Sequence, residues 1–362
     1  MSIPSLSASI QPYVDRKEIA GAVMFVANKE GVLAAEAVGW ADIEAGRRMT
    51  TDTIFWIASQ TKPITAVALM MLAEHGKVNV DDPVSKYLPE FASQMYAARR
   101  SADEVSLRNP ARAPTVKDML LHTSGLPFRT LLEEPAIDQE PLWARVRSYA
   151  MTILEFEPGT KTFYSNAGTN TLGRIIEVLS GQAYEQFLAE RLLEPLGMRD
   201  TTFWPGDEQM RRLAESYKAD PEDGHFVKIP IEFLHYPLTD TANRFAVPAG
   251  GLFSTARDIT KFYRMIANGG TLDGRVYLKP ETVQEMTLRH TPEDFEKAQG
   301  YGFEADKTMY GHGGAYSTRT WVDRESGLIL GWLVQHASFH GNGGEARDIF
   351  AKAAVERICG GR

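Results

Sequence analysis

Hydrophobic positions recur with two different periods along this chain, and each period belongs to its own regions. Short apolar or alternating runs, typical of β-strands, occupy residues 21–27, 32–39, 53–57, 308–311, 318–323 and 328–335. Apolar residues three to four positions apart, typical of helices, occur within residues 6–16, 59–76, 115–122, 139–155, 168–180, 183–193, 254–268 and 344–358. Strands are therefore expected near both chain ends and helices mainly in the middle.

That order favours one sheet built from both ends of the chain, with a mostly helical block inserted between its two parts. Two polar stretches interrupt the pattern. Residues 92–114 are expected to form a surface loop, and residues 205–247 are expected to form an irregular excursion that covers a cleft.

Composition and charge restrict the possible partners. The 362 residues, 43% of them hydrophobic, are enough for a large core. A net charge of −8 argues against nucleic acid and anionic membranes as partners. The N-terminal residues lack the features of a secretory signal, and no stretch is apolar enough to span a membrane, so a cytoplasmic location is expected unless an export signal has been removed. The single cysteine excludes an internal disulfide.

The first candidate for catalysis lies in the stretch 56–63. Ser59 and Lys62 are three residues apart, which places both side chains on one face of a helix. Pro63 is tolerated only in the first turn of a helix, so the helix begins near Ser59, where free N–H groups favour developing negative charge. Apolar neighbours predict a lysine with a lowered pKa, which can take the proton of a serine hydroxyl. A helix cap beside a solvated lysine is the alternative interpretation.

The second candidate is the pair Tyr164 and Asn166, which follows a Pro-Gly turn and precedes a helix. A tyrosine near cations can be phenolate-like and relay a proton, and Asn166 can donate to a substrate carbonyl. Taken alone, the two residues are better explained as a packed loop tyrosine and a helix-capping asparagine.

The third candidate is His312-Gly313-Gly314, on or beside a strand. Glycines weaken a strand, so their repetition requires a reason. One reason is close approach of a ligand to backbone N–H groups that complete an oxyanion hole, and the other is a bulge or tight bend. His336 and His340 are four residues apart but lack a carboxylate at matching spacing, so no metal site is expected.

These three elements, in this order, resemble the motifs of the serine β-lactamase and penicillin-binding-protein superfamily, and most closely its class C-like branch with the family VIII carboxylesterases. The S-x-x-K motif is Ser59-Gln60-Thr61-Lys62, and the Tyr-x-Asn motif is Tyr164-Ser165-Asn166. His312-Gly313-Gly314 stands in place of Lys-Thr-Gly. Residues 120–127 and 249–254 also look like signatures of this family, and the resemblance spans roughly residues 10–355.

The resemblance implies an α/β (α+β) fold with an antiparallel sheet, flanked by the N- and C-terminal helices, and an inserted, mostly helical domain. The expected boundaries are 1–75 and 248–362 for the sheet domain, and 76–247 for the helical domain with its loop excursions. The site would lie in the groove between them.

The resemblance also implies a role for each site residue. Ser59 would be the acylated nucleophile, Lys62 its activating partner and Tyr164 the general base or proton relay. Backbone N–H groups of Ser59 and Ala315 would form the oxyanion hole. The substrate pocket would be lined by Asn166, His312, Gly313 and Gly314. No cofactor and no metal are implied.

The histidine decides the expected substrate class. In the family, the lysine at this place is tied to binding substrate carboxylates, and a histidine is neutral much of the time near pH 7. We therefore expect a serine hydrolase acting on a small-molecule ester or amide, in the first place a carboxylesterase. A β-lactamase, a D-amino-acid peptidase, an acyltransferase and a non-catalytic binding protein are the alternatives. The sequence carries no signal for an oligomeric state.

Overall fold

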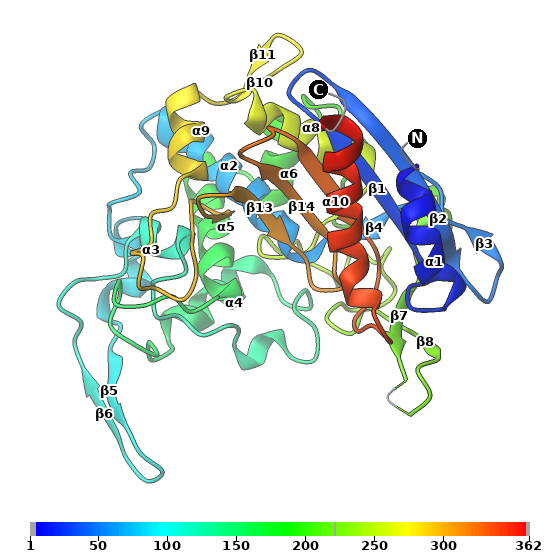
Figure 1. The fold of residues 1–362 in the computed structure, drawn as a ribbon. Coiled ribbons are helices and arrows are strands. Elements are labelled where there is room, and N and C mark those ends of the chain that lie inside the picture. Colours follow the sequence, from blue (N-terminus) through cyan, green and yellow to red (C-terminus); the bar gives the residue numbers. More distant parts are fainter. Residues whose placement is uncertain (1–4, 221, 360–362) are drawn as a thin grey trace.

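The structure, a computed structural model, describes residues 5–220 and 222–359. Seven strands form one antiparallel sheet in the order β12-β13-β14-β15-β1-β2-β3. Strand β1 (Gly21–Ala27) pairs with β2 (Val32–Asp42) on one side and β15 (Ile329–Leu333) on the other. The two ends of the chain therefore meet in the middle of one sheet, as the sequence pattern predicts (Figure 1).

The remaining strands are β3 (Arg47–Arg48), β4 (Phe55–Trp56), β5 (Tyr96–Arg100), β6 (Val105–Arg108), β7 (Ser216–Ala219), β8 (Phe226–Ile229), β9 (Phe253–Ser254), β10 (Thr271–Leu272), β11 (Arg275–Val276), β12 (Glu304–Ala305), β13 (Met309–Gly313) and β14 (Arg319–Asp323). The helices are α1 (Leu6–Asp15), α2 (Thr61–Glu74), α3 (Val116–Leu120), α4 (Leu142–Ala150), α5 (Asn166–Ser180), α6 (Tyr184–Leu188), α7 (Asp207–Arg212), α8 (Ala256–Ala267), α9 (Pro280–Thr287) and α10 (Ala346–Cys359).

Helices cover both faces of the sheet. The first and last helices, α1 and α10, pack together on one face, where Ile10 and Phe350 join Met24 and Trp332 of the strands in a buried cluster. Helix α8 packs on β1, β14 and β15 from the other face. Every residue of β1 is buried, because a strand covered on both faces must be apolar throughout. The fold expected from the resemblance is thus confirmed (Figure 1).

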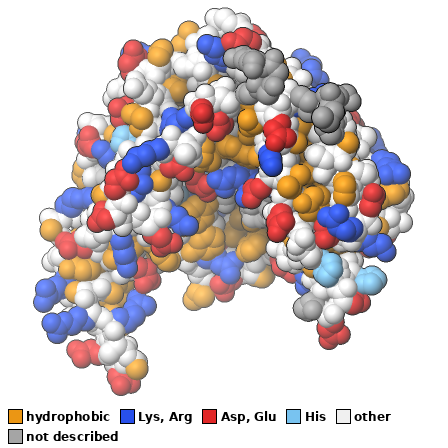
Figure 2. All heavy atoms as spheres, in the orientation of Figure 1, with side chains coloured by type: hydrophobic (Ala, Val, Ile, Leu, Met, Phe, Trp, Pro, Cys, Tyr) orange, Lys and Arg blue, Asp and Glu red, His pale blue; other side chains and the backbone are white. Residues whose placement is uncertain are grey.

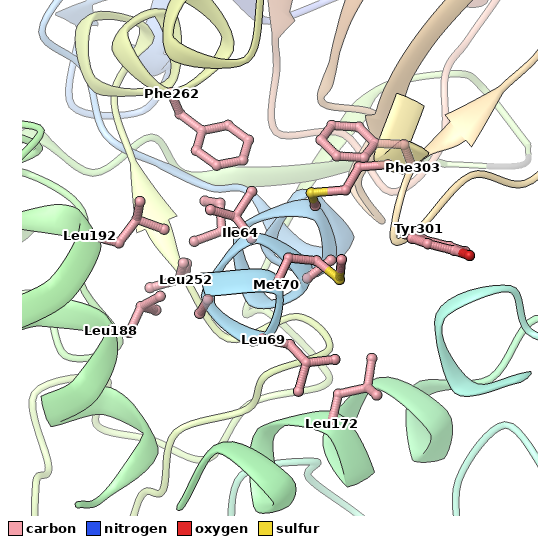
Figure 3. Close-up of a cluster of buried hydrophobic side chains, with 14 of the residues drawn as sticks. Ile64, Leu69, Met70, Leu172, Leu188, Leu192, Leu252, Phe262, Tyr301 and Phe303 are labelled. Carbon is pink, nitrogen blue, oxygen red and sulfur yellow. The ribbon is translucent and has the colours of Figure 1, made fainter. Parts of the chain in front are cut away.

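Helix α2, which follows Ser59, lies at the centre of the largest hydrophobic cluster. It is buried continuously from Thr61 to Met71, as a helix that is apolar on all sides must be. Figure 3 shows its side chains Ile64 and Leu69 surrounded by neighbours that include Leu172 of α5 and Phe262 of α8. Because this helix cannot move without opening the core, its first turn is a rigid support for catalytic groups.

Two segments predicted to lack regular structure are partly ordered into strands, so those predictions were wrong. Within residues 92–114, β5 and β6 form a hairpin that projects from the molecule (Figure 1), and Figure 2 shows basic side chains gathered along it. Within residues 205–247, α7 is followed by the β7–β8 hairpin. A buried ion pair between Arg244 and Asp138, with nitrogen and oxygen 2.7 Å apart, fixes the rest of this excursion to the body of the protein.

The helices of the middle block are found where periodicity predicts them, with shifted ends. Helix α4 is shorter than the predicted 139–155, since Pro141 precedes its first turn. Helix α5 begins at Asn166, and the cap is Ser165, whose hydroxyl accepts the N–H of Gly168 at 3.0 Å. The predicted capping box of α3 is present between Thr115 and Asp118. Strands β10 to β12 and helix α9 carry no clear sequence pattern and were not predicted.

The expectations about an export signal and about domain boundaries remain predictions. The signal-peptide prediction rests partly on residues 1–4, which lie outside the described residues. Among the helices that the structure describes, none combines the length and apolarity needed to cross a bilayer. The domain boundaries at 75/76 and 247/248 remain a prediction.

Candidate active site

Ser59 sits in a tight turn, Ala58–Gln60, between β4 and α2. Strand β4 is fixed by pairing with β9, and the N–H of Ile57 donates to Leu252 O at 3.0 Å. The indole N–H of Trp56 donates to Gly250 O at 2.8 Å. Ala58 has a φ of 45°, a left-handed conformation that costs a non-glycine residue energy. The structure holds this strained residue directly before the candidate nucleophile.

Lys62 is buried and its ammonium nitrogen faces Ser59. Its exposed fraction is 1%. Lys62 Nζ lies 3.3 Å from Ser59 Oγ, 2.7 Å from Asn166 Oδ1 and 2.7 Å from Ala249 O. No carboxylate forms an ion pair with it in the part of the chain that the structure describes. Burial without a counter-charge lowers the pKa of Lys62 well below its ordinary value, so the neutral amine is favoured.

A second layer of hydrogen bonds fixes the carbonyl that Lys62 contacts. The N–H of Ala249 donates to Asn170 Oδ1 at 3.0 Å, and the Asn170 amide donates to Glu133 and Tyr149 in turn. Tyr149 donates to the same carboxylate at 2.7 Å. All of these side chains are buried. Lys62 is therefore held by groups whose own positions are determined, as precise proton transfer requires.

The segment Tyr164-Ser165-Asn166 is anchored to the loop that follows α3. The N–H of Ser165 donates to His122 Nδ1 at 3.2 Å, and the Ser165 hydroxyl donates to Pro127 O at 2.7 Å. The N–H of Asn166 donates to Phe128 O at 3.1 Å. His122 itself has a φ of 58°, another strained position. These contacts explain how residues over 100 positions from Lys62 reach it.

The ring of Tyr164 lies among four groups. Lys62 Nζ is 4.6 Å from the ring centroid, and the ring centroids of His122, His312 and Phe128 are 4.7, 6.1 and 6.2 Å away. Burial raises the pKa of Tyr164 above its ordinary value, and a hydrogen bond with Ser59 offsets this only in part. Burial therefore favours the neutral phenol over the phenolate-like form considered from the sequence.

The glycines near His312 have a structural reason. A Cβ atom on Gly314 would lie 2.4 Å from Ile57 O, and one on Gly311 would lie 2.3 Å from Thr320 O. Close approach of the chain to itself, rather than a ligand, therefore requires glycine at these two positions. Gly313 differs, since its nearest neighbour would be 3.5 Å away. The approach at Gly314 brings β13 against the Ser59 turn.

Ala315 follows directly and is exposed. Within the described residues, its N–H forms no hydrogen bond, although the N–H of Gly314 donates to Thr318 O at 2.7 Å. This N–H is therefore available to an incoming group, and its role as an oxyanion donor remains a prediction.

The charged groups beside His312 neutralise one another. His312 is buried, and burial lowers its pKa to about 4, so the ring is neutral near pH 7. Its Nδ1 lies 2.6 Å from Gly313 O. On the neighbouring strand, Arg319 donates to the Glu304 carboxylate at 2.7 Å, and although burial raises the pKa of Glu304, this partner helps to hold it below its ordinary value. The wall formed by β12, β13 and β14 thus combines a neutral imidazole, that of His312, with an arginine whose positive charge is balanced by Glu304.

Sequence reasoning named most of this arrangement and missed part of it. The structure brings Ser59, Lys62, Tyr164 and Asn166 into contact and sets His312 beside them. The sequence analysis did not predict the contact of His122 with Tyr164, although His122 belongs to a segment that resembles a family signature. The network through Asn170 has no sequence signal, although Ala249 begins the second segment that resembles a family signature. Over the described residues, no group of three histidines, cysteines or acidic residues is arranged to hold a metal ion.

Comparisons with known proteins identify the family and agree with the observed fold. The family model described as Beta-lactamase matches residues 6–354. Protein Rv1367c of Mycobacterium tuberculosis is 32% identical, over 93% of this chain and 90% of its own length. Esterase EstB of Burkholderia gladioli is 30% identical, over 94% of this chain and 93% of its own length. Among solved structures, EstCE1, a hydrolase with promiscuous acyltransferase activity, has a TM-score of 0.80 at 23% identity, covering 96% of this chain and 97% of its own.

Proposed function

This chain belongs to the Beta-lactamase family and is a serine hydrolase, and from that premise we propose that it is a carboxylesterase that hydrolyses small, uncharged esters through an acyl-enzyme on Ser59. The observation that carries the proposal is the charge state of the pocket wall. His312 is neutral and Arg319 is paired with Glu304, so the wall offers no strong attraction to a substrate carboxylate. An ester without a free acid needs no such attraction.

We assign the activation of Ser59 to Lys62. A neutral amine has two N–H groups and one lone pair. Asn166 Oδ1 and Ala249 O each accept one N–H at 2.7 Å, which leaves the lone pair for the Ser59 hydroxyl at 3.3 Å. As Ser59 Oγ attacks the ester carbonyl carbon, its proton passes to Lys62.

Tyr164 is the proton relay in this proposal. As a neutral phenol hydrogen-bonded to Ser59, it can donate its proton to the oxygen of the leaving alcohol while it receives one from Lys62. The C–O bond of the ester then breaks, the alcohol leaves, and the acyl group stays on Ser59. Water reverses these transfers in the second half: Tyr164 and Lys62 take a proton from water, and Ser59 regains its proton as the acid is released.

Two backbone N–H groups, of Ser59 and Ala315, are assigned to the oxyanion hole. The first lies at the start of a helix that is fixed in the core, and the second is exposed and free. Each preorganised donor of this kind contributes roughly 3 kcal/mol to transition-state stabilisation. The Asn166 amide oxygen is engaged with Lys62, and we assign its N–H groups to donate to the substrate carbonyl.

Aromatic side chains around the site favour apolar substituents on the ester. Phe128 stacks beside Tyr164 and is 39% exposed, which leaves an apolar surface next to the reacting groups. Trp56, three residues before Ser59, is buried, stacks with Phe233 and packs edge-on against Tyr316, so these rings support the Ser59 turn from within the protein. The relative EstB is an esterase, which supports the same substrate class.

The test is a panel of substrates on wild-type protein and Ser59→Ala. We expect turnover of p-nitrophenyl acetate and butyrate by the wild type and its loss in Ser59→Ala. Nitrocefin and a D-alanyl-D-alanine peptide address the β-lactamase and peptidase alternatives, and adding a primary alcohol to the ester assay detects acyl transfer. Efficient nitrocefin or peptide turnover without ester turnover would overturn the proposal.

A further inference from the structure

A cavity of about 390 Å³ lies between the C-terminal end of α1, the end of β2 and the β7–β8 hairpin. These elements lie together at one side of the molecule in Figure 1. None of the residues assigned above to catalysis or substrate binding lines the cavity. It is therefore separate from the Ser59 site, and its walls require their own explanation.

Three of the walls are aromatic. Trp40 of β2 faces the cavity from one side, and Tyr217 and Phe226 of the hairpin face it from the other, with their ring centroids 6.0 Å apart and their planes at 52°. Trp40 already holds one cation: the guanidinium of Arg48, which does not line the cavity, lies 3.9 Å from the ring centroid. Aromatic faces around an open space are the standard environment for binding an organic cation.

Carboxylates outnumber cations around this space. Asp15, Glu44 and Asp223 line the cavity. Lys228 is the cation nearest to Glu44, and it is shared, because it also lies 3.4 Å from Asp42 and 3.1 Å from Glu215. A positively charged ligand would therefore gain electrostatic energy on entering.

The cationic and histidine side chains that line the cavity do not cancel the negative charge of these carboxylates. Arg16 donates to the Glu18 carboxylate at 2.8 Å and is thereby neutralised. Lys17 is exposed to solvent. Exposed His225 lies 3.1 Å from the Asp223 carboxylate. Next to Phe226, the ring of His336 is buried, and burial lowers its pKa to about 3, so this histidine adds no positive charge near Phe226 at neutral pH.

Gly224 allows the loop between β7 and β8 to lie in close contact with His340, and both residues line the cavity. Gly224 has a φ of 74°, and a Cβ atom there would lie 2.1 Å from His340 Nδ1. The imidazole of His340 therefore lies directly on the backbone of the hairpin and forms one lip of the cavity. A larger residue would displace this ring.

We propose that this cavity binds a small organic cation, a quaternary or tertiary ammonium group with a short alkyl or aryl substituent. The three rings surround the positive group, and the carboxylates of Asp15, Glu44 and Asp223 supply the attractive field. The volume admits such a group together with its substituent. This site is independent of the ester hydrolysis proposed for Ser59.

The experiment compares choline with its neutral carbon isostere, in which a tert-butyl group replaces the trimethylammonium group. Binding to the Ser59→Ala protein is measured by calorimetry or ligand-observed NMR, so the result does not depend on any catalytic activity. We expect choline to bind about tenfold more tightly than the isostere, as a partly desolvated cation–aromatic contact predicts. Equal affinity would indicate a general apolar cavity, and no saturable binding of choline below about 10 mM would exclude the site; either result overturns the proposal.

Amino-acid substitutions test whether choline binds in this cavity. Phe226→Leu should weaken choline binding about fivefold or more. Phe339→Leu is the matched control, because Phe339 also packs against His336 but does not line the cavity. Two substitutions of surface residues test the electrostatic contribution. Glu44→Gln removes a negative charge and should weaken choline binding, and Lys17→Gln removes a positive charge and should strengthen it. Affinities that stay the same in Phe226→Leu, Glu44→Gln and Lys17→Gln would contradict the proposal even if choline binds.

Discussion

Replacing Asn166 by aspartate tests the role of Lys62 more sharply than removing the lysine does. Asn166 Oδ1 accepts a hydrogen bond from Lys62 Nζ at 2.7 Å, and both side chains are buried. Asn166→Asp keeps the shape of the side chain and adds one negative charge at that distance. Burial alone lowers the pKa of Lys62 in the native protein, so the new charge acts directly against the cause of the shift.

The magnitude follows from the distance. Two opposite unit charges 2.7 Å apart attract by about 6 kcal/mol at an effective dielectric constant of 20. At about 1.4 kcal/mol per pKa unit, this raises the pKa of Lys62 by about four units. Desolvation of the new carboxylate opposes the change, so we expect a rise of at least about two units.

Whether the substitution lowers or raises the rate depends on which protonation form of Lys62 is active. If neutral Lys62 is the base, activity rises with pH through the pKa of Lys62, and a higher pKa moves this acidic limb to higher pH. At neutral pH, kcat/KM of Asn166→Asp should fall about 100-fold or more, and it should recover as the pH is raised.

The assay is kcat/KM for p-nitrophenyl butyrate between about pH 6 and pH 9, with thermal unfolding to confirm that the variant is folded. Asn28→Asp, in the turn between β1 and β2, makes the same chemical change away from the site and should leave the profile unchanged. A folded Asn166→Asp protein with an unshifted acidic limb, or with activity lost at every pH and no recovery, would refute neutral Lys62 as the base.

Three further predictions use the same geometry. Tyr164→Phe removes the relay hydroxyl and should lower kcat for p-nitrophenyl esters by about 10²–10⁴-fold without loss of stability, since the ring keeps its contacts. Gly314→Ala forces a Cβ to within 2.4 Å of Ile57 O and should lower kcat about tenfold or more by moving the oxyanion loop, whereas Gly313→Ala, whose nearest contact would be 3.5 Å, should be tolerated in the same assay. His312 is neutral when folded but takes up a proton below its ordinary pKa of 6.5 when unfolded, so its contribution to stability is lost as the pH falls from 6.5 towards about 4. Urea unfolding at pH 7 and pH 5 should show a smaller loss of stability in His312→Gln than in the wild type.

The sheet and the helices of the core could be predicted because burial enforces their periodicity. Strand β1 is buried at every position, and α2 is apolar over most of its length, so each left a clear pattern. The β5–β6 hairpin was missed because both of its strands are exposed and carry arginines, which removes the alternation that marks a strand. The β7–β8 hairpin was missed for a similar reason, since only one end of each strand is buried.

The candidate site was predictable where chemistry depends on spacing, and unpredictable where it depends on packing. The three-residue spacing of Ser59 and Lys62 and the position of Pro63 are local, so the sequence places them correctly. The protonation state of Tyr164 depends on how its ring is enclosed, which the sequence does not encode locally, and burial favours the neutral phenol. The contact between Lys62 and Ala249 O joins positions 187 residues apart and leaves no mark in the sequence.

The most direct test of the account is the chemical fate of Ser59 during turnover. The protein is mixed with p-nitrophenyl butyrate, quenched in acid within the first turnovers and measured by intact mass spectrometry and peptide mapping, with Ser59→Ala as the control. The account predicts a butyryl group on the peptide that contains Ser59 and none in the control. A wild-type protein that releases p-nitrophenol but carries the acyl group on another residue, or an equal yield of acylated protein in Ser59→Ala, would contradict it.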